Sequence, residues 1–274
     1  MIIALMYYEG DLEVTMELSR LLTDIETIPR SDVRLALVSQ PGTPRTPLVA
    51  WTVRHCQRRF EVDEVVSPLG AKGWPVACAA LWVGACRHYY DLYTKKQLGD
   101  HQCILTLDAN DGVPLHENWI DLMLQLHKNG READKLIMGT PYFVDRCPLH
   151  LNPNAIFDFE VFNTEPELLD LPRYDGSQLT HHDIYCRNPM LANASLSSAV
   201  RTDWHGAGEH ASGPLLLDRS RESIWLHGYK DADLRWQVRE HLARIPPPPQ
   251  IVQYNLEQLS RHALTQRYYE EAYL

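Results

Sequence analysis

The sequence predicts an α/β fold with a mostly parallel sheet, helices on both faces of the sheet and a helical tail at the C-terminus. Short apolar runs bounded by turn residues alternate with longer segments in which apolar residues recur at helical spacing. Such alternation is typical of parallel sheets, because each strand needs a crossover connection to reach the next one. The 274 residues suffice for one large domain of this kind.

Three strands and two helices are expected in the first quarter of the chain. The first apolar run ends at a Glu-Gly-Asp turn, which indicates a buried strand, and Pro29 ends the amphipathic helix that follows. A segment rich in Pro and Gly, 40–47, then separates the second strand from the second helix. The expected elements are strands 2–7, 33–38 and 61–66 and helices 12–28 and 48–59.

The alternation continues through the middle of the chain and resumes near its end. Pro75 stands at the first turn of an alanine-rich helix, a position that proline favours. Residues 141–203 are rich in Pro, Asn and Asp, so no regular element is predicted there. The expected elements are helices 76–90, 118–126 and 232–244 and strands 103–107, 136–139 and 223–226.

Four consecutive prolines, 246–249, mark the expected end of the main domain. Such a run forms a stiff polyproline segment, which should separate a helix expected at 254–269 from the rest of the protein. We therefore expect a main domain over 1–244 and a tail over 245–274, made of a proline-rich linker and a C-terminal helix.

Composition limits the classes of partner. The formal net charge of −10 argues against a surface that binds nucleic acid wherever it touches, because phosphate binding depends on Lys and Arg. No apolar run approaches the roughly 20 residues that a membrane span needs, and the first residues lack the features of a signal peptide. We therefore expect a cytoplasmic protein. The six cysteines are scattered without metal-site or disulfide spacing, as buried apolar residues would be.

The strongest functional signal is an acidic loop, Asp108-Ala109-Asn110-Asp111, directly after a buried strand. Loops at the carboxyl ends of parallel strands carry the ligand sites of α/β folds. Carboxylate and amide oxygens suit Mg²⁺ or Mn²⁺, and such an ion can bridge a protein and a diphosphate. The alternative is that these side chains only cap the following turn.

A second segment, His227-Gly228-Tyr229-Lys230, follows the last strand expected in the main domain. A neutral imidazole binds Mn²⁺, and a nearby ammonium group offsets the charge of phosphates. The alternative for His227 is a partly buried surface histidine. The order of the two segments, with the acidic loop first and His-Gly late, favours a joint site.

The two segments resemble motifs of the GT-A glycosyltransferases. The strand and its acidic loop are similar to the DxD motif of that family, with Asn110 where the family usually has a second aspartate. His227 and Lys230 match the HGxK ending of several GT-A families. The resemblance implies a Rossmann-like GT-A fold, a nucleotide-sugar donor whose diphosphate meets Lys230, and a divalent cation, Mn²⁺ or Mg²⁺. The implied metal ligands are Asp108, either Asn110 or Asp111 or both, and His227.

The same resemblance places two further segments against the donor. In the family, the region that matches 70–75 lies under the nucleotide sugar, and the loop that matches 7–11 holds the base and the ribose. A tyrosine there would stack on uracil. The implied donor contacts are Tyr7, Tyr8, Asp11, Lys72, Trp74, Asp108 and Lys230. The alternatives are a plain helix-entry turn at 70–75 and an N-cap by Asp11.

The expected catalytic base lies late in the chain. Inverting members of the family use a carboxylate in this region as general base toward the acceptor hydroxyl. Glu209 is the first candidate and Asp203 the second, since both lie in a stretch whose Trp and Gly residues suit sugar binding. A retaining enzyme would need no such base, and either carboxylate can instead cap a turn.

The sequence thus predicts a metal-dependent glycosyltransferase that moves a sugar, first of all from a UDP-sugar, to an acceptor hydroxyl. One alternative is a nucleotidyltransferase, although the Gly-rich basic loop usual after its first strand is missing here; another is a non-catalytic nucleotide-sugar-binding module. The acceptor can be a glycan, a protein, a small molecule or a hydroxymethylated base in DNA. The net charge disfavours DNA. A basic cluster keeps that option open but equally fits a solvated helix face; its members are Arg54, His55, Arg58 and Arg59.

Overall fold

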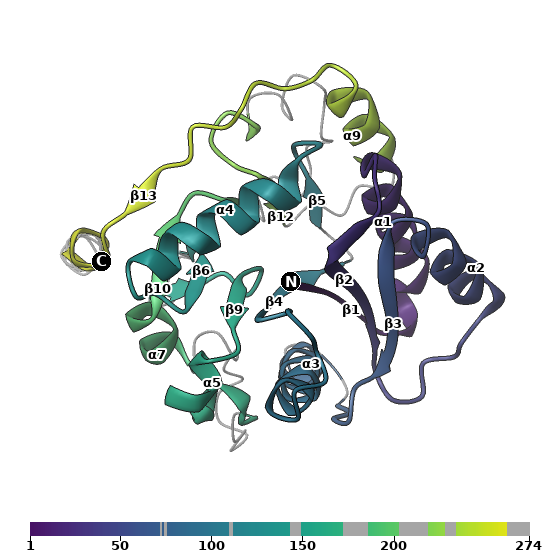
Figure 1. Cartoon of the computed structure of the whole chain (residues 1–274), viewed down its shortest axis with the longest axis horizontal. Helices are drawn as coiled ribbons and strands as arrows, with labels where there is room; N and C mark the ends of the chain where they lie inside the picture. The colour runs from purple at the N-terminus through teal and green to yellow at the C-terminus, as the bar shows by residue number, and fades with distance from the viewer. Residues whose placement is uncertain are drawn as a thin grey trace, which may run out of the picture.

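The computed structural model of the chain describes residues 1–71, 73, 76–109, 112–142, 149–171, 186–202, 219–227 and 234–261 (Figure 1). Among these residues, eight strands form one large sheet in the order β13-β10-β6-β9-β4-β1-β2-β3. The strands are β1 (Ile2–Tyr7), β2 (Arg30–Ser39), β3 (Phe60–Val66), β4 (Cys103–Asp108), β6 (Ile137–Gly139), β9 (Ile156–Asp158), β10 (Ala194–Ser197) and β13 (Gln253–Tyr254).

The sheet is mostly parallel, as predicted. β1 pairs in parallel with β2 and β4, β2 with β3, and β6 with β10. β9 is inserted antiparallel between β4 and β6, and β13 is antiparallel to β10 at the edge. Every residue of β1 is buried, because a central parallel strand is covered on both faces.

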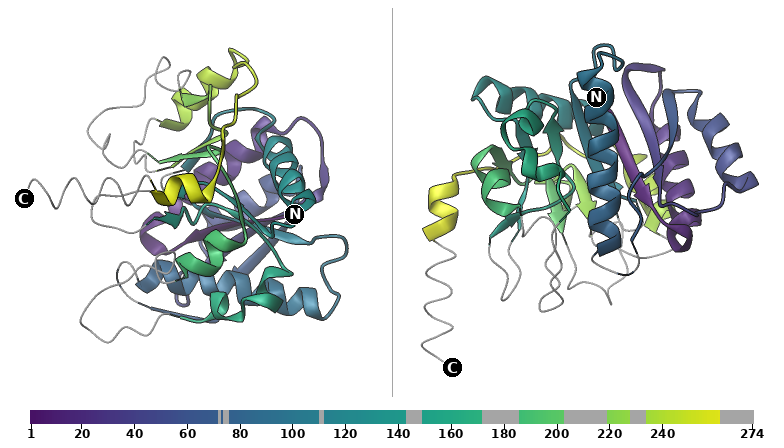
Figure 2. Two further views of the ribbon diagram at one scale, coloured as in Figure 1. Left: turned by 90° about the vertical axis from the view of Figure 1, so that its left-hand side faces the viewer. Right: turned by 90° about the horizontal axis from the view of Figure 1, so that it is seen from below.

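Helices cover both faces of the sheet, which confirms the predicted layers (Figures 1 and 2). Successive residues of β1 alternate between two hydrophobic cores: Ile3 and Leu5 lie in one, Ile2 and Ala4 in the other. The first core includes residues of α1 (Leu12–Ile25), α2 (Pro47–Cys56), α4 (Trp119–Glu132) and α9 (Leu234–Leu242), and the second includes residues of α3 (Val76–Thr94), α5 (Val161–Thr164) and α7 (Arg187–Ala192). No helix in the described part of the chain is both long and apolar enough to cross a membrane.

A second sheet of short strands begins just beyond β4. Within the described ranges its order is β11-β12-β5, formed by β11 (Val200–Thr202), β12 (Trp225–His227) and β5 (Gly112–Pro114). β12 runs antiparallel to β5, so that His227 lies opposite Gly112. An added Cβ at Gly112 would lie 2.6 Å from Nε1 of Trp225, so only glycine permits this close approach. The pairing brings His227 close to Asp108 at the carboxyl end of β4.

The prediction that 141–203 lacks regular structure is wrong for its described residues. They contain β7 (Pro141–Tyr142), β8 (His150–Leu151), η2 (Pro166–Leu169), β9, α5, α7, β10 and β11. The longest of these elements, α7, has six residues. Segments this short contain too few residues for a helical or alternating period to be recognised.

The chain after the four prolines packs onto the body. The N–H of Ser198 donates to the carbonyl of Val252 (2.9 Å), and the N–H of Val252 donates to Oγ of Ser198 (3.1 Å). β13 thus extends the large sheet by one edge strand, where the sequence predicts a separating linker. A helix follows from residue 256 and is described as far as 261. The domain boundary at 244 stays a prediction.

Candidate functional site

The carboxyl ends of β1, β2 and β4 lie side by side at one edge of the large sheet. The register pairs Met6 with Asp108 and Tyr7 with Ser39. Because these strands are parallel and adjacent, Asp108 at the end of β4 lies at the same edge as the Tyr7-Tyr8 segment. The sequence predicts that both belong to one donor site.

Asp108 and His227 are in direct contact, although they are far apart in the sequence. Nε2 of His227 lies 3.3 Å from Oδ2 of Asp108. The His227 side chain is only 3% exposed, whereas the Asp108 side chain is 34% exposed. β12 carries the imidazole to this point, since its partner β5 starts four residues after Asp108. The two strongest sequence signals therefore share one location; their roles as ligands stay predictions.

A buried asparagine pair, which the sequence analysis missed, connects the surroundings of Asp108 and His227. The N–H of Asp108 donates to Oδ1 of Asn154 (2.9 Å). Asn154 in turn donates from its backbone N–H (2.8 Å) and from Nδ2 (2.9 Å) to Oδ1 of Asn152. Nδ2 of Asn152 lies 3.3 Å from Nδ1 of His227. Both asparagines are 1% exposed, so this chain of hydrogen bonds is shielded from water.

Two polar groups lie near Nδ1 of His227: Nδ2 of Asn152 at 3.3 Å and Oγ1 of Thr202 at 3.5 Å. Nδ2 of Asn152 also donates to Oγ1 of Thr202 at 2.6 Å. With its proton on Nδ1, the imidazole donates to Thr202 and presents the lone pair of Nε2 toward Asp108, which is the tautomer that a cation ligand requires. With its proton on Nε2, the ring accepts from Asn152 and donates toward the Asp108 carboxylate, so cation binding selects between the two forms.

The residues expected to contact the base and ribose differ in exposure. Tyr7 is buried and belongs to the first hydrophobic core, and burial raises the pKa of its phenol. Tyr8 is 39% exposed. Asp11 ends the short helix η1 (Glu9–Asp11) and makes no side-chain capping bond at the start of α1, contrary to the capping alternative. Of the two tyrosines, only Tyr8 has its ring at the surface, where it can stack on a ligand.

A hydrogen bond connects Ala71, which follows β3, to the carboxyl edge of the large sheet. Nε2 of Gln40, directly after β2, donates to the carbonyl of Ala71. Ala71 therefore lies near the carboxyl end of β2, as the donor-site prediction requires. Several predicted site residues lie outside the described residues, and their placement stays a prediction: Lys72, Trp74, Asn110, Asp111, Asp203, Glu209 and Lys230.

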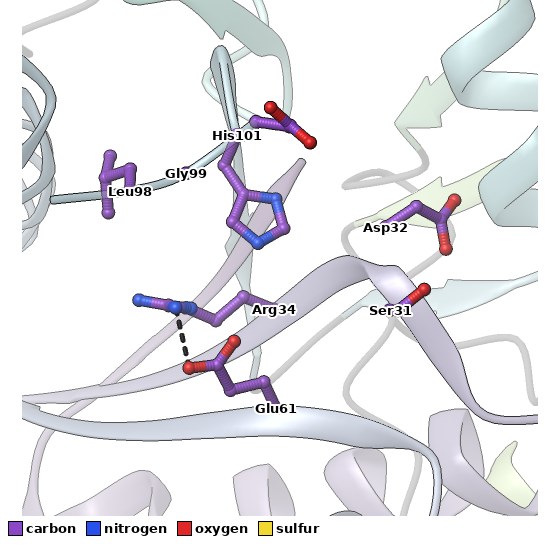
Figure 3. A pocket seen from close by; sticks show the side chains of 8 residues that line it. Ser31, Asp32, Arg34, Glu61, Leu98, Gly99 and His101 are labelled. Atoms are coloured by element: carbon purple, nitrogen blue, oxygen red, sulfur yellow. Dashed lines mark hydrogen bonds and ion pairs between the residues drawn. The ribbon is translucent and has the colours of Figure 1, made fainter. Parts of the chain in front are cut away.

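A separate pocket of about 440 Å³ lies at the opposite, amino edge of the sheet (Figure 3). It is lined by Ser31, Asp32, Arg34, Glu61, Leu98, Gly99, Asp100 and His101. Arg34 is already paired there, since its guanidinium lies 2.6 Å from Glu61 and 3.4 Å from Asp63. Because ligands of α/β sheets bind beyond the carboxyl ends of strands, this pocket is not the candidate site.

The Asp108 and His227 pair fits part of a metal site. Two adjacent ligands of an octahedral Mg²⁺ or Mn²⁺, each about 2.1 Å from the ion, lie about 3 Å apart, close to the observed 3.3 Å. No group of three or more His, Cys, Asp or Glu side chains suited to a metal occurs among the described residues. Asn110 and Asp111, the other predicted ligands, lie outside them. A carboxylate and an imidazole leave most coordination positions to a diphosphate and water.

Comparison with solved structures finds the same fold in known proteins. The galactosyltransferase LgtC in complex with donor and acceptor sugar analogs matches with a TM-score of 0.51 and 12% identity, over 91% of this chain and 98% of that chain. An active-site mutant of LgtC matches with a TM-score of 0.51 and 11% identity over the same shares. Mouse xyloside xylosyltransferase 1 gives 0.48 and 9% over 82% and 96%. No protein-family model and no curated protein matches the sequence. The chain has the GT-A fold of glycosyltransferases.

Proposed function

We propose that this protein is a glycosyltransferase that moves a sugar from a nucleotide diphosphate to an acceptor hydroxyl. The observation that carries the proposal is the contact between Asp108 and His227, 3.3 Å apart at the carboxyl edge of the large sheet. In a GT-A fold this edge is also where the resemblance places the donor. The contact is specific support, because the sequence alone predicted both residues for one cation site.

The residues of the site suit a diphosphate held through a divalent cation. Asp108 and His227 would hold the ion, with Asn110 or Asp111 as further ligands. When bound, Mn²⁺ or Mg²⁺ would neutralise charge that develops on the departing nucleotide diphosphate. UDP is the nucleotide that the resemblance favours, and the exposed ring of Tyr8 is the candidate stacking partner for uracil.

The surrounding residues position these ligands. Asn154 fixes the backbone at Asp108, and Asn152 with Thr202 fixes the imidazole plane of His227. Such outer partners orient ligands before the donor arrives, which lowers the reorganisation needed in the reaction. Lys230, three residues after His227, would offset diphosphate charge as the glycosidic bond breaks.

Transfer also requires removal of a proton from the acceptor hydroxyl. In an inverting reaction Glu209, or else Asp203, would accept that proton. In a retaining reaction neither would be needed, so substitution of both by Ala would leave the rate of transfer almost unchanged. The anomeric configuration of the product, measured by NMR, identifies which case applies.

A screen of nucleotide sugars tests the proposal. Free nucleotide released by the full chain would be measured by mass spectrometry with Mn²⁺, Mg²⁺ or chelator, starting with UDP-sugars. We expect metal-dependent release that Asp108→Ala and His227→Ala abolish. Asp91→Ala and His88→Ala are the matched controls on α3, and they should behave like the parent.

Two results, from this screen combined with a thermal-shift or a pyrophosphate assay, would contradict the proposal. A melting-temperature shift with UDP and Mn²⁺ but no release over hours indicates a non-catalytic binding module. Formation of pyrophosphate from a nucleoside triphosphate and a sugar phosphate, without donor cleavage, indicates a nucleotidyltransferase.

A further inference from the structure

In one stretch of this acidic protein the charged side chains are all arginines. The chain has 36 Asp and Glu, yet none occurs between Asp32 and Glu61. Five arginines occur in that interval: Arg34, Arg45, Arg54, Arg58 and Arg59. The interval covers most of β2, all of α2 and the turn that leads into β3.

These arginines fall into two groups. Arg34 is paired with Glu61, and Arg45 with Glu64 at 2.6 Å. The guanidinium groups of Arg54, Arg58 and Arg59 form no ion pair or side-chain hydrogen bond with any residue that the structure describes. Three unneutralised charges therefore lie within six positions of the chain.

The fold presents this group at the periphery of the molecule. α2 packs on α1 and β3, and among the labelled helices and strands none lies outside it (Figure 1). Val49, Val53 and Cys56 face the core, so Arg54 and Arg58 project from the opposite side and are exposed. The helix face is therefore open to a partner.

An aromatic ring extends the basic cluster. Trp51 is 46% exposed, and the guanidinium carbon of Arg20 lies 5.0 Å from its ring centroid. Arg20 comes from α1, so two helices contribute cations to one surface. We name Arg20, Trp51, Arg54, Arg58 and Arg59 the α2 face.

We propose that the α2 face binds the phosphate backbone of a nucleic acid. Guanidinium groups match phosphate oxygens bidentately, and protein surfaces that bind nucleic acid are polar and strongly basic. A protein partner would need an apolar centre to its interface, but Trp51 is the only exposed large apolar side chain between residues 47 and 59. One carboxylate near this face, that of Asp24 on α1, is already paired with His55 at 2.7 Å and with Arg239 at 2.9 Å. Acidic residues beyond a Debye length, about 8 Å at physiological salt, are screened, so local charge decides binding.

Fluorescence anisotropy of the full chain with labelled 20-nucleotide DNA, single-stranded and duplex, tests this proposal without any sugar donor. We expect binding that weakens as salt rises from 50 to 200 mM. Arg54→Gln with Arg58→Gln should reduce the slope of log affinity against log salt by about 2, because each arginine releases about one counterion.

Arg45→Gln is the matched control. It removes one positive charge from the same stretch, half of what the double variant removes, but from a residue already paired with Glu64, so it should leave affinity within about twofold. Melting temperatures of all variants check folding, because Arg54 also lies at the carboxyl end of α2, where cations stabilise a helix.

Three results would overturn the proposal: no binding by the parent at 50 mM salt, equal weakening by Arg45→Gln, or displacement of DNA by polyglutamate as effectively as by unlabelled DNA. The last result would indicate an acidic protein as the partner. Since no donor is present, failure here leaves the proposed transferase activity untouched, and failure of the donor screen leaves DNA binding untouched.

Discussion

The two edges of the large sheet both gather charged residues, but they use them differently. At the amino edge, the guanidinium of Arg30 lies 2.8 Å from Asp32, 2.8 Å from Asp121 and 3.5 Å from Glu26. The N-terminal ammonium lies 3.0 Å from His101 in the same region. At the carboxyl edge, the Asp108 side chain is one-third exposed and lies 3.3 Å from the buried imidazole of His227.

This difference separates a structural cluster from a candidate site. At the amino edge Arg30 is paired with three carboxylates, so we expect its substitution to affect stability. At the carboxyl edge the asparagines hold the backbone and ring in place, while the Asp108 carboxylate keeps part of its surface open. Substitutions should therefore affect activity at the carboxyl edge and stability at the amino edge.

The largest effect is expected at the carboxyl edge. Asp108→Asn and His227→Gln should each lower the rate of donor cleavage by at least about 100-fold. Each variant removes a proposed ligand of the cation that would neutralise the diphosphate. Steady-state kinetics with Mn²⁺ would measure this. Urea unfolding should change by less than about 1 kcal/mol in Asp108→Asn, whose side chain is one-third exposed, whereas His227→Gln replaces a buried ring and should cost about 1–3 kcal/mol. A larger loss of stability in Asp108→Asn would contradict the assignment.

The opposite pattern is expected for Arg30→Met. Its removal leaves the carboxylate of Glu26 buried without a cation, while Asp32 and Asp121 remain more than half exposed to water. Unfolding free energy should fall by roughly 2–3 kcal/mol, less than for a fully buried pair. Donor cleavage per folded molecule should match the parent, and a comparable loss of activity would remove the distinction between the two edges.

Asn152→Ala should have an intermediate effect on activity. It removes the donor that holds Oγ1 of Thr202 beside His227 Nδ1 and the acceptor for Asn154, so the imidazole loses its fixed orientation. Loss of such an outer partner typically costs about 10–100-fold in metal affinity or activity. Asn163→Ala on α5 is the control. Mn²⁺ titration by calorimetry measures the affinity directly, and an unchanged affinity would show that the asparagine pair is only structural.

The smallest effect concerns pH and belongs to the amino edge. Burial, and then Arg131, lowers the pKa of His127 to about 4, from 6.5 in an unfolded chain. Below pH 6.5 the imidazole of His127 is therefore protonated in the unfolded state, whereas in the folded state it stays neutral until about pH 4. Stability should fall by about 1–2 kcal/mol as pH drops from 7 to 5. Urea unfolding of the parent and of His127→Gln tests this, because the variant should be less sensitive to acid.

The sequence predicts best those strands and helices that are long enough to show a complete pattern of buried apolar residues. The strands β1 to β4 were predicted within a few residues, and Asp108 and His227 were paired from their motifs alone. β9 has three residues, and its antiparallel insertion depends on partners from β4 and β6. Such a strand is specified by tertiary contacts, which no local pattern records.

The positioning residues were missed for a related reason. Asn152-Pro153-Asn154 has the composition of a turn, and each asparagine acts through contacts with residues more than 40 positions away or with its near neighbour. The sequence does not indicate that these two asparagines are buried. Their role can be recognised only from the fold, which shows that they contact Asp108 and His227.

Pulsed EPR of Mn²⁺ bound to the full chain with UDP tests the central claim most directly, because it detects nitrogen and phosphorus nuclei next to the ion. We expect both ¹⁴N and ³¹P couplings in the parent, loss of the ¹⁴N coupling alone in His227→Gln, and weaker Mn²⁺ binding in Asp108→Asn. A parent spectrum without nitrogen coupling, or a nitrogen coupling that persists in His227→Gln, would contradict a cation shared by these two residues.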